Sequence, residues 1–121
     1  MTSEELRERT LAFALAVFEF LRPLFRSSET RNIAQQLLDA ATSVAANYRA
    51  AGHARSSKEW RAKLGVVVEE SDESAFWLLF IQRAGPSEVA HDALGSLLDE
   101  AQQLTRIFGA ALATSRNLSK S

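Results

Sequence analysis

Apolar residues, with an occasional threonine or serine, recur at alternating steps of four and three through four long blocks of this chain. In the first block the repeat begins at Leu6, Thr10, Phe13 and Val17 and continues to Leu24. A mean period of about 3.5 residues keeps these side chains on one face of an α-helix, and it is typical of helices that pack lengthwise with left-handed crossings of roughly 20°. No segment shows the strict alternation of a β-strand. The pattern therefore predicts an all-α fold.

Two capping patterns mark helix starts. Thr2 precedes Glu5 by three residues, and Ser56 precedes Glu59 by the same interval. At this spacing a hydroxyl and a carboxylate can each accept a hydrogen bond from the other residue's backbone N–H. Together with the apolar periodicity, these signals predict helices over residues 3–26, 30–51, 57–84 and 88–113.

Glycine and proline residues indicate where these helices end. We expect Gly52 to end the second helix in the left-handed conformation that glycine adopts readily, and Gly85-Pro86 to end the third. Pro23 either ends the first helix near residue 26 or kinks it. The polar segment from Thr114 onward is expected to fray.

The predicted connections are too short to cross the length of the helices. Helices of roughly 22 to 28 residues are about 33–42 Å long, whereas the loops contain only about two to six residues. Successive helices must therefore turn back on one another. We expect residues 1–121 to form a single domain, an antiparallel up-down-up-down left-handed four-helix bundle.

Composition narrows the functional classes. The chain has 121 residues, 46% of them hydrophobic, which suits one domain with a continuous core. The absence of cysteine excludes disulfides, thiolate metal sites and a cysteine nucleophile. The N-terminal residues lack the features of a signal peptide, and no apolar run approaches the length of a membrane span, so we expect a cytoplasmic protein without membrane contact. With 14 Lys and Arg against 15 Asp and Glu, any attraction to nucleic acid must come from a local group of cations.

Two predicted helices carry more apolar residues than one core-facing stripe requires. One reading is a wide core whose phase is shifted by a residue. A second is a homo-oligomer interface, because contiguous exposed apolar residues usually mark a partner surface. A third, a membrane-surface role, is disfavoured because neither stripe is backed by a Lys-rich polar face. The extra stripes consist of Leu11, Leu15, Phe18 and Phe25 on the first helix and Phe76, Leu79 and Phe80 on the third.

Basic residues gather around the connection between the second and third helices, and we call this group the basic tip. Glu59 is the only acidic residue in the interval, so the cations could attract a nucleic-acid phosphate or another subunit's carboxylates. The alternative is a solvated helix end in which Glu59 pairs with Lys63. The basic tip consists of Arg49, Arg55, Lys58, Arg61 and Lys63.

A metal site has only fragmentary support. Glu88 and His91 have the spacing used in carboxylate-bridged di-iron bundles, but such sites need a second Glu-x-x-His pair and further inward carboxylates. The other histidine, His53, follows Gly52 in a predicted loop. No catalytic triad, phosphate loop or dinucleotide motif is present. We therefore predict no metal, no cofactor and no enzymatic activity.

Three segments resemble the four-helix-bundle proteins first noticed in intervening sequences of bacterial 23S rRNA genes. These are AATSVAANYRAA at residues 40–51, SxEWxxKL at 57–64 and EExxExxFWL at 69–78. The resemblance covers nearly the whole chain and implies a small bacterial protein that assembles as a homopentameric ring. The chain is also similar to the accessory proteins of diversity-generating retroelements, which bind nucleic acid together with a reverse transcriptase. Those relatives are markedly basic, whereas this chain has a pI near 6.1.

The polar residues inside these segments allow two interpretations. Small residues of the second helix permit close packing, and its polar residues then lie at helix edges. Alternatively, Asn47 joins Arg49 and Lys63 in a polar site with Glu69 or Glu73 of the same or an adjacent subunit. From the sequence we expect a homo-oligomeric, non-enzymatic interaction protein that contacts RNA or DNA through the basic tip. The competing hypothesis is a protein-only scaffold or regulator that docks another protein on its apolar or acidic faces.

Overall fold

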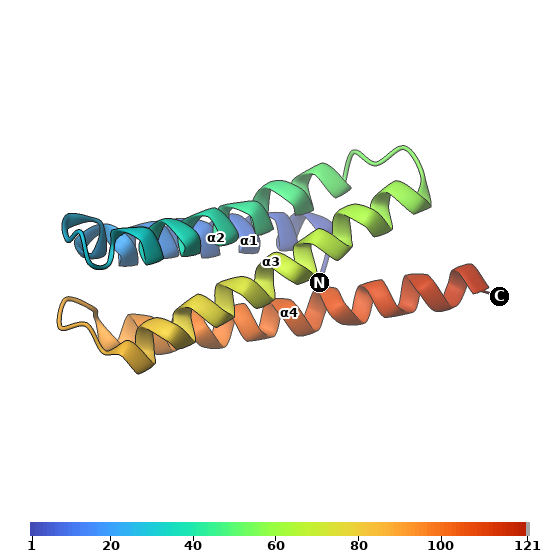
Figure 1. The fold of residues 1–121 in the computed structure, drawn as a ribbon. Helices are drawn as coiled ribbons and strands as arrows, with labels where there is room; N and C mark the ends of the chain where they lie inside the picture. Colours follow the sequence, from blue (N-terminus) through green and yellow to red (C-terminus); the bar gives the residue numbers. More distant parts are fainter. Residues whose placement is uncertain (121) are drawn as a thin grey trace.

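The computed structural model describes residues 1–120, which form four α-helices and one short 3-10 helix (Figure 1). No strand occurs among these residues, so the predicted all-α class is confirmed. None of the helices within this range has both the length and the apolar content needed to cross a bilayer. The elements are α1 (Ser3–Leu21), η1 (Arg22–Arg26), α2 (Arg31–Ala51), α3 (Ser57–Ala84) and α4 (His91–Lys120).

Each helix packs against the next one along the chain, and a smaller contact between α1 and α4 completes the arrangement. Figure 1 places the α2–α3 loop at one end of the molecule and the other two connections at the opposite end. The heptad positions of the helices meet in one core, whose fully buried members include Leu37, Leu64, Leu104 and Phe108. The helix faces assigned from the apolar periodicity are therefore the faces that point inward.

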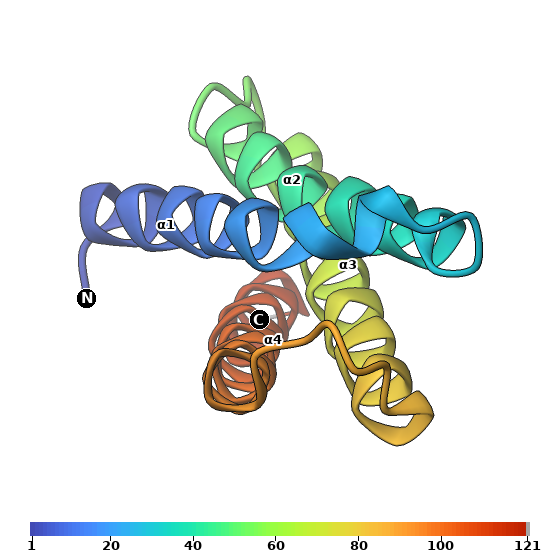
Figure 2. The ribbon, with the colours of Figure 1, turned by 90° about the vertical axis from the view of Figure 1, so that its left-hand side faces the viewer.

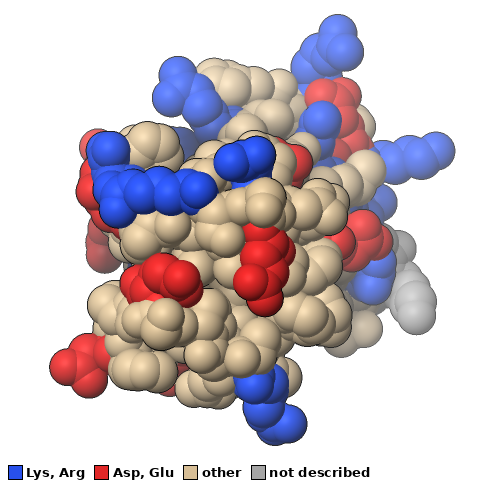
Figure 3. Space-filling view, turned by 60° about the vertical axis from the view of Figure 1, so that its left-hand side comes forward, with Lys and Arg blue, Asp and Glu red and all other residues tan. Residues whose placement is uncertain are grey.

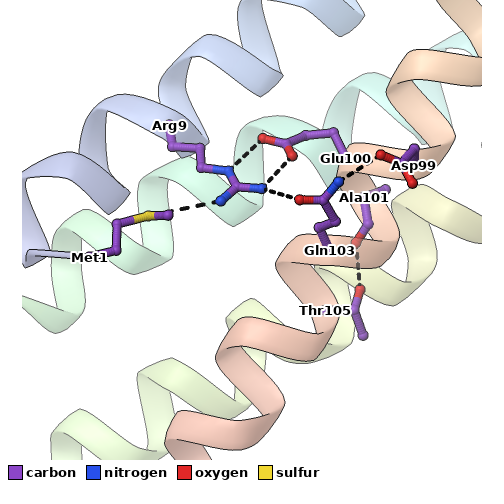
Figure 4. Close-up of polar contacts among 7 residues, drawn as sticks. All are labelled: Met1, Arg9, Asp99, Glu100, Ala101, Gln103 and Thr105. Atoms are coloured by element: carbon purple, nitrogen blue, oxygen red, sulfur yellow. Dashed lines mark hydrogen bonds and ion pairs between the residues drawn. The ribbon is translucent and has the colours of Figure 1, made fainter.

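A polar clamp joins α1 to α4, which have the least extensive packing of the α-helix pairs that contact each other. Figure 2 shows α4 almost end-on while α1 extends across the view, so the two helices are inclined to each other. Arg9 spans the gap: its Nε donates to Glu100 Oε2 at 2.8 Å and its Nη2 donates to Oε1 at 2.6 Å (Figure 4). Gln103 Oε1 accepts a further bond from Nη2 at 2.9 Å. The hydrogen bond to Glu100 raises the pKa of the Arg9 guanidinium above its ordinary value.

Both predicted capping patterns lie at helix starts. Thr2 Oγ1 accepts from the Glu5 backbone N–H at 3.1 Å, and the Glu5 carboxylate accepts from the Thr2 N–H at 3.4 Å. Ser56 Oγ accepts from the Glu59 N–H at 3.0 Å. These bonds satisfy donors that have no partner inside the helix, so the boundaries read from the sequence have a local chemical cause.

The first predicted helix is divided at Pro23. The α-helix ends at Leu21, and residues 22–26 continue as the 3-10 helix η1. Proline has no N–H to donate to the carbonyl four residues earlier, so the α-helical hydrogen-bond ladder cannot continue through it. Carbonyls of η1 are satisfied from α2 instead: the Thr30 hydroxyl donates to Leu24 O at 2.6 Å, and Arg31 Nε donates to Phe25 O at 3.2 Å.

The conformation predicted for Gly52 is wrong. Its φ of −64° lies in the right-handed helical region, and α2 ends through tight turns in which His53 N–H and Ala54 N–H donate to carbonyls three residues back. Such turns satisfy the last carbonyls without a left-handed residue. Gly85, at φ 64°, is the left-handed residue that ends α3.

The prediction for the fourth helix is wrong at both ends. It begins at His91 rather than at 88, because Pro86 to Ala90 form a turn from which buried Val89 enters the core. The predicted end at residue 113 is also too early, since α4 is helical through residue 120, and Ser121 of the expected frayed tail lies outside the described residues. No proline interrupts this segment, and buried Leu112 anchors it to the core.

Candidate functional site

The basic tip is assembled from two helix ends and the loop between them. Arg49 lies in the last turn of α2, Arg55 in the loop, and the other three members in the first two turns of α3. Arg49, Arg55 and Lys58 are exposed, while Arg61 and Lys63 are half-buried. The five cations therefore lie on two helix ends joined by a short loop, and their common role stays a prediction.

Little negative charge compensates the basic tip. Within the described residues Glu59 pairs with Arg55, whose Nε lies 3.8 Å from Glu59 Oε2, and not with Lys63 as the solvated-end interpretation expected. The Arg55 side chain is 90% exposed, so this pair is screened by water. The cations at the N-terminus of α3 also oppose the helix dipole. Positive potential is therefore available to an external anion. By contrast, basic and acidic residues are interspersed over large uncharged areas on the face seen in Figure 3.

Arg7 is a neighbour of the basic tip that the sequence analysis missed. A Cβ placed on Gly52 would lie 3.7 Å from Arg7 Nη1, so this guanidinium of α1 lies beside the end of α2. Arg7 and Arg49 also line a groove of about 320 Å³ between α1 and α2, with Leu11 and Ala45 among its other residues. No local sequence pattern reports this proximity, because it depends on how α1 packs against α2.

Six of the seven residues proposed for an oligomer interface are exposed. Phe25 is the exception: it is half-buried and packs against the core, which is the role expected from the wide-core interpretation. We call the exposed residues the α1 stripe, consisting of Leu11, Leu15 and Phe18, and the α3 stripe, consisting of Phe76, Leu79 and Phe80; their exposed fractions range from 39% to 59%. The stripes lie on helices that do not contact each other. They are therefore two separate apolar surfaces.

An aromatic cluster underlies the α3 stripe. The Phe76 and Trp77 rings are 4.9 Å apart in an edge-to-face arrangement, and the Trp77 and Phe80 rings are 5.8 Å apart. Edge-to-face contacts of this kind are a favoured arrangement of aromatic pairs. The Trp77 indole N–H is buried and has no hydrogen-bond partner among the described residues. The cluster therefore presents mainly apolar surface.

The residues of the proposed polar site are not joined within one protomer. Asn47 Nδ2 donates to Ser43 O at 3.0 Å and to Ser43 Oγ at 2.8 Å, so it bonds within its own helix. Glu69 and Glu73 are exposed on α3. Any joint site would need an adjacent subunit.

Four acidic residues lie close together on α3, and one of them has a perturbed carboxyl group that the sequence analysis passed over; they are Glu69, Glu70, Asp72 and Glu73. Partial burial raises the pKa of Glu70, and the nearby charges of Glu73, Glu69 and Asp39 raise it further. Asp39 belongs to α2, so the contact between α2 and α3 concentrates negative charge at this seam. The seam contrasts with the basic tip farther along the same two helices.

The residues considered for a metal site are not arranged as one. Glu88 lies in the turn before α4, so it does not share a helix face with His91. Within residues 1–120 no group of three histidine, cysteine or acidic side chains is placed to hold a metal ion. The Glu-x-x-His spacing indicates a metal site only when both residues lie on the same helix and point in the same direction.

This fold defines an all-helical protein with a basic tip and two exposed apolar stripes. It is similar to the crystal structure of a protein of unknown function from the S23 ribosomal protein family of Bacteroides thetaiotaomicron, with a TM-score of 0.83 and 20% sequence identity. The match covers 93% of this chain and 99% of that chain. No family model matches the sequence, and neither does any curated protein. The likeness confirms, at the level of the fold, the resemblance drawn from the sequence motifs.

Proposed function

We propose that this chain is a non-enzymatic, cytoplasmic interaction protein whose antiparallel, left-handed up-down-up-down bundles assemble into a homopentamer. We further propose that the assembly contacts RNA or DNA through the basic tip. The observation that carries the proposal is that one small domain has both a group of five cations, compensated only by an exposed pair between Arg55 and Glu59, and two separate exposed apolar stripes.

The two stripes support a ring rather than a twofold dimer. A twofold interface uses the same surface on both subunits, whereas a ring joins two different surfaces head to tail. The α1 stripe and the α3 stripe are different surfaces on helices that do not touch. The number five comes from the family resemblance. A ring would repeat the basic tip around one axis and so multiply its attraction for a polyanion.

Nucleic-acid contact is supported by the location of the cations. Because the whole chain is close to neutral, attraction to phosphate depends on this local group. Arg7 adds a further guanidinium beside it. Binding of this kind is expected to weaken steeply as salt increases, because each neutralised phosphate releases counterions.

A second candidate function is a scaffold that docks a different protein. The aromatic cluster at the α3 stripe favours it, since aromatic residues are frequent anchors at protein interfaces. In that case the purified chain is monomeric and the basic tip is dispensable.

Light scattering at low and high salt, combined with the ultraviolet absorbance ratio, separates these functions. The proposal predicts a salt-resistant pentamer that loses co-purifying nucleic acid only at high salt. The variant Arg55→Glu/Lys58→Glu/Arg61→Glu should abolish nucleic-acid binding and leave the mass of the assembly unchanged. A matched control, Arg26→Glu/Arg83→Glu/Arg106→Glu, makes the same charge change at exposed arginines outside the tip and should retain binding. A monomer refutes the ring, and equal losses in the two variants refute the assignment to the basic tip.

A further inference from the structure

Trp60 lies among the cations of the basic tip and has a different environment from the other tryptophan. It is half-buried on the second turn of α3, with one side packed against the core. No aromatic ring contacts it among the described residues, whereas Trp77 lies in contact with two phenylalanines. In the sequence Arg61 follows it directly, Lys58 precedes it by two residues with Glu59 between them, and Lys63 follows at the three-residue spacing that places two side chains on one helix face.

Two shallow pockets meet at Trp60. One has a volume of about 440 Å³ and is lined by Arg55, Ser56 and Ser57 together with Trp60. The other has a volume of about 460 Å³ and is lined by Trp60 and residues of α4 between Ala110 and Leu118. Trp60 therefore separates a polar, cationic pocket from a mainly apolar one.

The continuation of α4 beyond residue 113 builds the second wall of this site. Ser115 lines both pockets, and Thr114 lines the apolar one. In Figure 1 the C-terminal turns of α4 lie at the same end of the molecule as the α2–α3 loop. If α4 ended at residue 113, Trp60 would lie on an open face of α3. Because α4 continues, Trp60 lines two pockets.

We propose that the basic tip binds single-stranded nucleic acid, with an unpaired base stacked against the Trp60 indole and the adjacent phosphates held by Arg55, Lys58 and Arg61. This inference rests on the proposed nucleic-acid function and deepens it. An aromatic ring beside cations is the combination that single-strand binders use, because every base offers a flat face for stacking. A duplex keeps those faces inside its own stack, so it can use the cations but not the ring.

Intrinsic fluorescence tests the contact without changing Trp60. The variant Trp77→Phe leaves Trp60 as the only tryptophan and keeps an aromatic ring in the α3 cluster. We expect oligo-deoxythymidine and oligouridine of about 15 nucleotides to quench its fluorescence at low salt, and a duplex of equal phosphate number to leave it nearly unchanged. The two single strands also report whether DNA or RNA is preferred.

Affinity measurements separate stacking from charge. Trp60→Leu should weaken single-strand binding on the order of tenfold, within the range known for one stacked base, while the slope of log affinity against log salt stays constant. Trp60→Phe, which retains a ring and the packing against the core, should bind with intermediate affinity. Lys58→Gln should instead reduce the salt slope by about 0.7, the value for one lost phosphate contact on a single strand. Circular dichroism melting verifies that each variant is folded.

The outcomes distinguish failure of the Trp60 stacking site from failure of the proposed nucleic-acid function. Quenching by single strands and a loss in Trp60→Leu at constant salt slope support the stacking site. Salt-dependent binding without quenching, or equal affinity for duplex and single strand in all Trp60 variants, overturns the inference and leaves the basic tip as a general phosphate surface. Absence of binding by any oligonucleotide overturns the proposed nucleic-acid function together with the inference.

Discussion

The clamp between Arg9 and Glu100 should contribute measurably to stability, because α1 and α4 share the least packing of the α-helix pairs that contact each other. The change to make is Arg9→Met, which keeps an unbranched side chain, together with Glu100→Gln and the double variant. Both Arg9 nitrogens bond the carboxylate at 2.6 and 2.8 Å, and the two side chains are only 23% and 27% exposed. The double-mutant cycle isolates the energy of this pair from the cost of each substitution.

The expected coupling lies between two known limits. Fully exposed ion pairs contribute about 0.2–1 kcal/mol, whereas hydrogen bonds to charged groups in less exposed sites contribute about 1.5–3 kcal/mol. The clamp is bidentate but partly solvated, so we expect about 1–1.5 kcal/mol. In a chain of this size that corresponds to a fall in melting temperature of about 4–6 °C.

The assay is urea unfolding followed by circular dichroism, at one fixed protein concentration because any assembly makes stability depend on concentration. Glu19 and Arg22 provide an internal control. They form a similar two-bonded pair within one stretch of chain, at 2.9 and 3.1 Å, but their side chains are 66% and 56% exposed. The same cycle there should give a clearly smaller coupling. Additive effects at Arg9 and Glu100, or a coupling no larger than that of the control, would refute the idea that the clamp fastens α1 to α4.

Three further predictions concern the Glu70 carboxyl group, two glycine positions and the α3 stripe. The pKa of Glu70 is higher in the folded protein than its unfolded value near 4.5, so ionisation of this carboxyl group opposes folding as pH rises from the unfolded to the folded pKa. Glu70→Gln should therefore be more stable than the parent above this interval and should lose the advantage as pH falls through it. Urea unfolding at a series of pH values measures the difference. Gly85→Ala should destabilise the protein by about 1–2 kcal/mol because its φ is 64°, whereas Gly95→Ala, on a helix with open space around the added methyl, should stabilise it by roughly 0.5–1 kcal/mol; stabilisation of both would contradict the backbone argument. Phe76→Ser/Phe80→Ser should lower the solution mass without loss of helix content if the α3 stripe is an interface, and an unchanged mass by light scattering would show that it is not.

Helix boundaries could be read from the sequence wherever one residue acts on its own neighbours. Thr2 and Ser56 cap helices through bonds three residues away, and Pro23 interrupts the α-helix by lacking an N–H. The prediction failed at Gly52 and at the start of α4. At Gly52 alternative local turns satisfy the last carbonyls of α2, whereas at the start of α4 the burial of Val89 delays the helix.

The candidate site was predictable only in part, for a similar reason. Its five cations are close in sequence, so a short loop was enough to predict that they gather. Phe25 could not be distinguished from its exposed neighbours in the same stripe, because periodicity gives the direction of a side chain and not what covers it. Arg7 escaped notice because it reaches the tip only through the packing of α1 on α2.

The sequence by itself determined the all-α class, the number of helices and the faces that enter the core, because these depend on periodicity and capping within single segments. Tertiary structure decided which distant residues meet: Arg9 with Glu100, and Trp60 with the last turns of α4. Such pairings are set by the lateral order, tilt and axial offset of the helices. These quantities arise from the sum of many weak core contacts, so no local pattern in the chain encodes them.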